Sequence, residues 1–132
     1  MSEVVITSIA LMGILLFVLG ANVTRFRVQR GKSGGNQQPT DPGDPMLVAI
    51  RAHGNAAEYV PTLAVLLVVT SIFVDGWWLD ALAIAAVVAR YLHGIGMLAS
   101  GSLARRTPYK EAGALLTYAV GLALGVTALV AR

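Results

Sequence analysis

The stretch RAHGNAAEYVP, at positions 51 to 61, places ionisable side chains at the mouth of an apolar helix. At about 100° per residue, Arg51, Asn55 and Glu58 fall within roughly 60° of one another on the helix. Thr62 continues this polar stripe. Ionisable groups in membrane-buried helices are costly and usually face a bundle interior or a water-filled cavity. The spacing therefore predicts a polar site at the edge of a membrane, without naming its ligand.

A second polar group lies in the segment ARYLHGIG, residues 89 to 96. Arg90 and His93 are three residues apart, and Met97 completes the same line. Two helices with such stripes can solvate each other's charges, and Arg90 with Glu58 is the expected pair. The same two residues are also consistent with a structural ion pair that holds the helices together and performs no chemistry.

Other polar residues have simpler interpretations. Arg51 lies near a loop, so its side chain can extend to the membrane surface. His53 points away from the polar stripe and is expected to be interfacial or to pack, and His93 can bond a neighbouring helix. No Asp, Glu or His spacing predicts a metal site. The chain has no cysteine, so disulfides and protein thiolates are excluded.

The composition indicates a membrane protein. Hydrophobic residues make up 56% of the 132 residues, charged residues 13%, and the mean hydropathy is +0.70. In soluble domains, apolar residues average about 45–50% and charged residues about 25%. A spanning helix needs about 20 apolar residues, and four segments qualify. We predict an all-α membrane protein of one domain, residues 1–132, folded as a four-transmembrane-helix bundle. The expected spans are residues 4–24, 47–74, 79–100 and 112–131.

Two polar loops set the expected orientation. Residues 25–46 carry four basic side chains, and residues 101–111 carry three; these are Arg25, Arg27, Arg30 and Lys32, then Arg105, Arg106 and Lys110. The positive-inside rule places both loops in the cytoplasm and both termini outside. In the first loop, Asp44 before Pro45 is the expected N-cap of the second helix. Gly121 and Gly125 form a G-x-x-x-G pattern, which permits close helix approach within or between chains.

The pattern R-A-H-x-N-x-x-E-x-x-P resembles the hallmark of the MAPEG family, the membrane-associated proteins in eicosanoid and glutathione metabolism. Here it reads Arg51, His53, Asn55, Glu58 and Pro61 at the start of the second span. The third-span arginine-x-x-histidine stretch is similar to that of the family. The resemblance covers nearly the whole chain and implies a homotrimer that binds glutathione between subunits, toward the cytoplasmic side.

The resemblance also assigns residues and a reaction. Arg51, Asn55 and Glu58 match residues that contact glutathione, and Arg90 and His93 match positions lining the same site. A thiol with a pKa of about 8.5 must ionise to attack, and a nearby arginine stabilises its thiolate. Arg105 and Arg106 are the two candidates for the single catalytic arginine that some family members carry near the start of the fourth span. The implied activity is a transferase or peroxidase of detoxification, acting with glutathione on hydrophobic electrophiles or lipid hydroperoxides.

The chain departs from the family at Met97, where several catalytic members have a tyrosine. A methionine cannot donate a hydrogen bond; Tyr91, Tyr109 and Tyr118 are candidates to compensate. Two other functions therefore stay open. One is a non-catalytic MAPEG-like protein that binds lipid or acts as a scaffold. The other is a small multidrug exporter with Glu58 as its proton-coupled carboxylate, which neighbouring arginines disfavour because they would hold Glu58 ionised.

Overall fold

The protein is described by a computed structural model of residues 1–131, and this range contains helices but no strand. The helices are α1 (Glu3–Ser33), α2 (Pro45–Phe73), α3 (Trp77–Ala99) and α4 (Pro108–Val130). All four are long and apolar enough to cross a membrane. The chain is therefore an integral, multi-pass membrane protein, and the predicted all-α four-helix architecture is confirmed.

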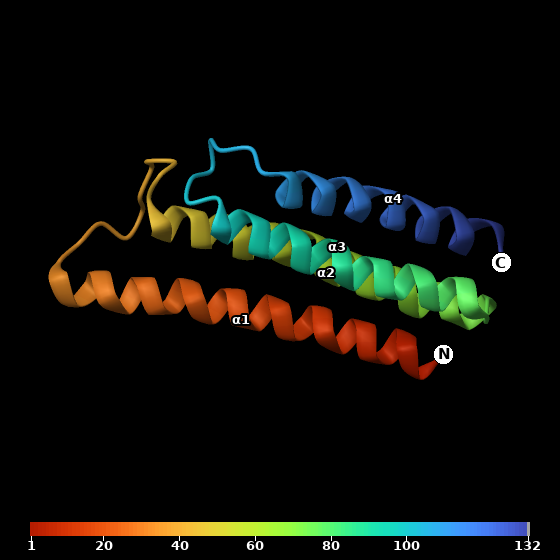
Figure 1. Ribbon diagram of the computed structural model, residues 1–132. Coiled ribbons are helices and arrows are strands. Elements are labelled where there is room, and N and C mark those ends of the chain that lie inside the picture. The colour runs from red at the N-terminus through yellow and green to blue at the C-terminus, as the bar shows by residue number, and fades with distance from the viewer. Residues whose placement is uncertain (132) are drawn as a thin grey trace.

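The central pair of helices is α2 and α3, and α1 and α4 lie on opposite sides of this pair (Figure 1). Each outer helix packs on both central ones, while α1 and α4 do not touch each other within residues 1–131. Both termini and the short α2–α3 turn lie at one end of the bundle, and the two longer loops lie at the other (Figure 1). The apolar core is formed along the central pair.

The first helix is longer than the sequence predicted. We expected a loop from residue 25, but α1 continues to Ser33 and ends at Gly34, whose φ of 68° lies in the left-handed region that favours glycine. The loop prediction was wrong for residues 25–33 because the apolar run ends near Thr24, whereas the polar residues that follow are good helix formers. Residues 108–111 of the second predicted loop are likewise the first turn of α4.

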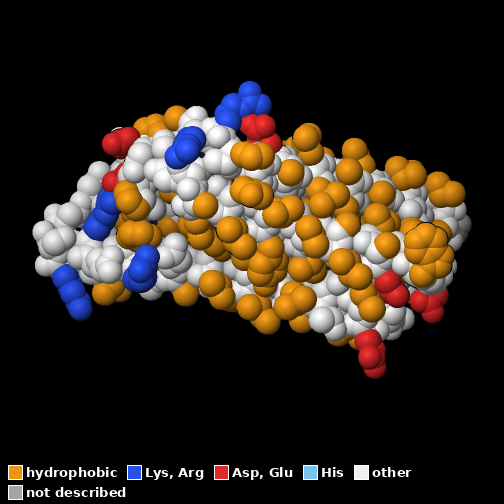
Figure 2. Space-filling model, in the orientation of Figure 1, with side chains coloured by type: hydrophobic (Ala, Val, Ile, Leu, Met, Phe, Trp, Pro, Cys, Tyr) orange, Lys and Arg blue, Asp and Glu red, His pale blue; other side chains and the backbone are white. Residues whose placement is uncertain are grey.

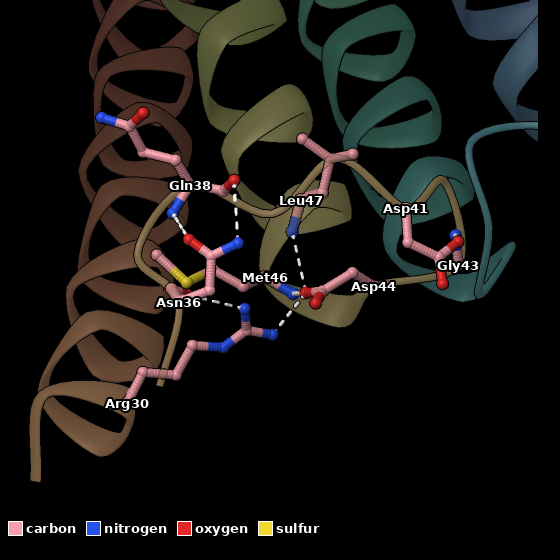
Figure 3. Close-up of polar contacts among 8 residues, drawn as sticks. All are labelled: Arg30, Asn36, Gln38, Asp41, Gly43, Asp44, Met46 and Leu47. Atoms are coloured by element: carbon pink, nitrogen blue, oxygen red, sulfur yellow. Dashed lines mark hydrogen bonds and ion pairs between the residues drawn. The ribbon is translucent and has the colours of Figure 1, made fainter. Parts of the chain in front are cut away.

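The start of α2 is fixed by the predicted Asp44 cap (Figure 3). Asp44 Oδ1 accepts hydrogen bonds from the backbone N–H groups of Met46 at 2.8 Å and Leu47 at 3.4 Å. The same oxygen accepts a charge-assisted bond from Arg30 Nη2 at 2.5 Å. Arg30 belongs to the last turn of α1. The ion pair therefore ties the end of the first helix to the beginning of the second.

This cap gives a pH-dependent prediction. The Arg30 guanidinium hydrogen bond, more than the backbone bonds, lowers the pKa of Asp44. A carboxyl with a lowered folded-state pKa stabilises the fold above its unfolded pKa of about 4, and this stability is lost as pH falls through the lower folded value. We expect the thermal midpoint in detergent to fall in that acidic range, and Asp44→Asn to reduce the fall. Equal acid sensitivity of the two proteins would contradict this assignment.

The closest helix contact joins α3 and α4 at two glycines. A Cβ built on Gly113 would lie 2.5 Å from the backbone N of His93, and one on Gly96 would lie 2.6 Å from the backbone N of Lys110. The G-x-x-x-G pair behaves differently, because Gly121 meets only a Leu63 side-chain atom at 3.8 Å and Gly125 faces open space. The tight intramolecular packing therefore depends on Gly96 and Gly113.

The basic side chains gather at one end of the bundle. Figure 2 shows Lys and Arg side chains, with some acidic groups among them, toward the end that carries the two longer loops. Hydrophobic side chains cover the face in between, and acidic groups without basic neighbours lie at the opposite end. The opposite end holds the start of α1, the α2–α3 turn and the start of α3. The apolar band between two polar ends is the distribution that a membrane requires.

Candidate functional site

Arg90 on α3 forms the centre of a polar cluster inside the bundle. It is a large side chain with 1% of its surface exposed. Its Nη2 donates to Asn55 Oδ1 on α2 at 2.7 Å, and its Nη1 donates to Thr117 Oγ1 on α4 at 3.1 Å. The guanidinium carbon lies 5.3 Å from the centroid of the Tyr59 ring, a cation–π distance. Arg90 thus links three helices through neutral partners.

The expected ion pair between Arg90 and Glu58 is absent. Within residues 1–131 the ion pairs are Arg30–Asp44 and Arg106–Glu111, and Glu58 is exposed on the surface of the single chain. The reason is the rotation of α2. Glu58 lies about 60° further round the helix than Asn55, away from the side that packs on α3. Arg51 is exposed on that same outer side.

The tyrosines proposed to compensate for Met97 lie in three different places. Tyr91 is committed elsewhere, because its hydroxyl donates to the Leu11 carbonyl of α1 at 3.0 Å. Tyr109 is exposed at the start of α4. Only Tyr118 lies beside the Arg90 cluster, with its hydroxyl 3.5 Å from that of Tyr59 and their ring centroids 5.8 Å apart. Met97 is buried.

His93 is held by the first turn of α4. Its Nδ1 lies 2.9 Å from the carbonyl oxygen of Lys110. A carbonyl oxygen only accepts, so Nδ1 carries a proton and donates this hydrogen bond. The bond to a neighbouring helix is the simpler of the interpretations that the sequence left open. His53 lies on a different side of α2, where its ring packs against Gly20 of α1.

The two candidate catalytic arginines differ in their surroundings. Arg106 Nε donates to Glu111 at 2.5 Å, and its side chain is 86% exposed; this bond raises the Arg106 pKa. Arg105 is exposed, and its side chain makes no hydrogen bond or ion pair within residues 1–131. Its backbone carbonyl, however, accepts from Lys110 Nζ at 2.6 Å. Lys110 therefore fixes the backbone from which Arg105 projects.

An apolar groove of about 370 Å³ lies between α2 and α4, next to the Arg90 cluster. Tyr59, Tyr118 and Thr117 line the end of the groove that adjoins this cluster, and Leu66 and Leu122 continue it along the two helices. Thr62, the last member of the polar stripe, also lines it. An elongated hydrophobic molecule in this groove would have one end beside polar hydroxyl groups.

Within one chain, the structure brings together only some of the predicted site residues. Asn55 and Arg90 are in direct contact, and His93 lies one turn further along α3. Arg51, Glu58, Arg105 and Arg106 are exposed, and none forms a hydrogen bond or ion pair to Asn55 or Arg90 in the described part of the chain.

Sequence reasoning missed three residues of the site, Tyr59, Thr117 and Lys110. Tyr59 directly follows Glu58 and Thr117 interrupts an apolar run. Two adjacent hydroxyl side chains in an otherwise apolar run, Thr117 and Tyr118, are the signal that could have identified this position.

Comparison with known families gives one result. A family model described as the MAPEG family matches residues 5–130, nearly the whole chain. No match was found among curated proteins or among solved structures. No group of three or more His, Asp or Glu side chains in residues 1–131 is placed to hold a metal ion.

Proposed function

Because the chain belongs to the MAPEG family, we propose that it is a membrane enzyme that binds glutathione and transfers it to hydrophobic electrophiles, or reduces lipid hydroperoxides with it. Arg51, Asn55 and Glu58 would contact the tripeptide. The single observation that carries the proposal is the outward position of Arg51 and Glu58 beside the internally anchored Asn55. A charged side chain within a spanning helix that has no partner in its own chain requires a partner in a ligand or in another subunit.

Glutathione supplies matching charges. Its two carboxylates suit the planar, charge-assisted donors of Arg51, and its ammonium suits the Glu58 carboxylate. Because these two side chains face away from the helices of their own chain, a neighbouring copy would complete the site. We accordingly propose the homotrimer that the family resemblance implies, with glutathione between subunits. The basic end of the bundle, which carries the two longer loops, would face the cytoplasm under the positive-inside rule.

The proposed reaction uses the thiolate of glutathione, since the chain has no cysteine of its own. The thiol proton leaves to water, a guanidinium stabilises the resulting anion, and the sulfur attacks the electrophilic carbon. One S–C bond forms, and the leaving group departs with the bonding electron pair. Arg105 or Arg106 would stabilise the thiolate. The apolar groove between α2 and α4 offers hydrophobic surface for the second substrate.

A non-catalytic, lipid-binding scaffold is the second candidate, favoured by one observation. Met97 is buried at the position where the resemblance places a tyrosine in several catalytic members, and it donates no hydrogen bond to a thiolate. This candidate predicts lipid binding that does not depend on glutathione and no thiolate formation in the site.

Calorimetry tests the proposed site. Detergent-purified wild type is expected to bind glutathione, and Arg51→Ala and Glu58→Gln are each expected to weaken binding by at least about tenfold, the usual effect of losing a hydrogen bond to a charged group. Thiolate absorbance is read on the same samples. A matched control is Lys32→Ala, which removes an exposed positive charge from the last turn of α1 and should leave the affinity unchanged. Absence of binding to wild type would overturn the proposal and favour the scaffold.

A further inference from the structure

We infer that Arg90 is a positioning residue: it holds the Asn55 carbonyl oxygen, so that the Asn55 amide presents its NH₂ group, a hydrogen-bond donor, to the glutathione-site ligand. This inference rests on the proposed function and adds a donor–acceptor assignment to it. A carbonyl or carboxylate oxygen of the ligand would bind at Asn55. The ligand ammonium would be excluded from Asn55 and left to Glu58.

The orientation of the amide follows from what its partner can offer. A guanidinium has donors and no acceptor. The Asn55 atom that lies 2.7 Å from Arg90 Nη2 must therefore be the carbonyl oxygen, Oδ1. The opposite orientation would place the amide NH₂ group against the guanidinium, donor against donor, inside the bundle. Chemistry therefore selects one of the two orientations that an asparagine side chain can adopt.

The other terminal nitrogen of the Arg90 guanidinium is also held by a hydrogen bond, to Thr117. Thr117 donates its own hydroxyl proton to the Gly113 carbonyl at 2.7 Å, so its oxygen faces Arg90 as an acceptor. In this chain of hydrogen bonds every donor points the same way, from Arg90 to Thr117 and from Thr117 to the Gly113 carbonyl of α4. The second arm of the same guanidinium then donates to Asn55. Such chains of hydrogen bonds polarise and reinforce one another.

The other end of the amide is available to a ligand. Asn55 Nδ2 makes no hydrogen bond within residues 1–131. Among the side-chain polar atoms of this range, Arg90 Nε is the one that is both buried and without a partner, so Asn55 Nδ2 is accessible. Arg51, one turn earlier on the stripe, also offers only donors. Glu58, one turn later, offers an acceptor when ionised. Along α2 the site thus presents donor, donor, acceptor.

A double-mutant cycle measured by calorimetry tests this role, using wild type, Arg90→Met, Asn55→Ala and the double variant. We expect Arg90→Met to weaken glutathione binding about tenfold in the wild-type background, because the amide is free to turn its oxygen outward. In the Asn55→Ala background the same change should alter the dissociation constant less than about twofold. An equal loss in both backgrounds would overturn the inference, since Arg90 would then act directly or through the fold.

Asn55→Asp gives an independent test that retains the arginine. The carboxylate keeps an oxygen toward Arg90 but presents an acceptor where the amide presents a donor, so glutathione binding should fall at least about tenfold. Wild-type affinity in this variant would overturn the inference even if Arg90→Met fails to fold. The matched control is Thr70→Val, which removes a buried α2–α4 hydrogen bond at 3.4 Å and should leave the affinity unchanged. Failure of wild type to bind glutathione would instead reject the proposed function itself.

Discussion

Gly113→Ala is expected to destabilise the protein strongly, although alanine is the better helix former. The added Cβ would lie 2.5 Å from the His93 backbone N and 2.8 Å from the Ala89 carbonyl oxygen. Both are backbone atoms, so no side chain can move aside and α3 and α4 must separate. Overpacking costs up to about 3 kcal/mol, and each kcal/mol moves the midpoint by a few degrees. We expect the thermal midpoint in detergent to fall by about 10 °C.

Gly125→Ala is the matched control on the same helix. A Cβ at Gly125 meets nothing within 4 Å in the single chain, and replacing glycine by alanine in a helix is favourable by about 1 kcal/mol. The two substitutions are therefore expected to change stability in opposite directions. A drop of similar size for both variants would contradict the packing argument, and would instead point to a contact at Gly125 between copies of the chain.

The same glycine connects packing to the site. Gly113 lies one turn before Thr117, and its carbonyl accepts the Thr117 hydroxyl proton. Separation of α3 from α4 would move Thr117 away from Arg90. We therefore expect the Gly113 variant to lose glutathione affinity together with stability, whereas the Gly125 variant should retain its affinity.

Most of the fold could be predicted from the sequence, because four uncharged or nearly uncharged runs leave few alternatives in a membrane. The exact end of α1 could not be predicted in this way. The hydrophobic run ends near Thr24, whereas the helix continues to the glycines at positions 34 and 35. Hydropathy predicts which residues lie in the membrane, whereas capping residues predict where a helix begins and ends. Asp44 followed by Pro45 was a capping signal, and it marked the start of α2 correctly.

The polar site could be predicted only as a set of residues that share a face. Helical spacing grouped Arg51, Asn55 and Glu58, but the sequence does not give the rotation of α2 about its axis. That rotation decides that Asn55 contacts Arg90 while Glu58 faces outward. The charge of Arg90 suggested an acidic partner, yet a neutral amide, a hydroxyl and an aromatic ring surround it.

Arg105→Gln is expected to cause the largest loss of activity, lowering kcat/KM for glutathione conjugation about 100-fold. A preorganised donor to a developing anion contributes a factor of about 10²–10³. Arg105 has an uncommitted side chain within residues 1–131 on a backbone that Lys110 fixes at 2.6 Å. Arg106 is already bound to Glu111, so Arg106→Gln should cost much less. Rates with a hydrophobic aryl halide measure both effects.

The titration of bound glutathione separates thiolate stabilisation from a general loss of structure. A guanidinium beside the sulfur lowers the thiol pKa below its usual value of about 8.5. Removing Arg105 should raise the pKa at which thiolate absorbance appears, so less thiolate is present at pH 7, while the dissociation constant changes little. Glu111→Gln frees Arg106 and should not reproduce this shift.

If Arg106→Gln raises the thiol pKa more than Arg105→Gln does, the two arginines exchange roles. If neither changes it, the thiolate is not stabilised by this loop, and the buried Met97 then favours the scaffold over the enzyme.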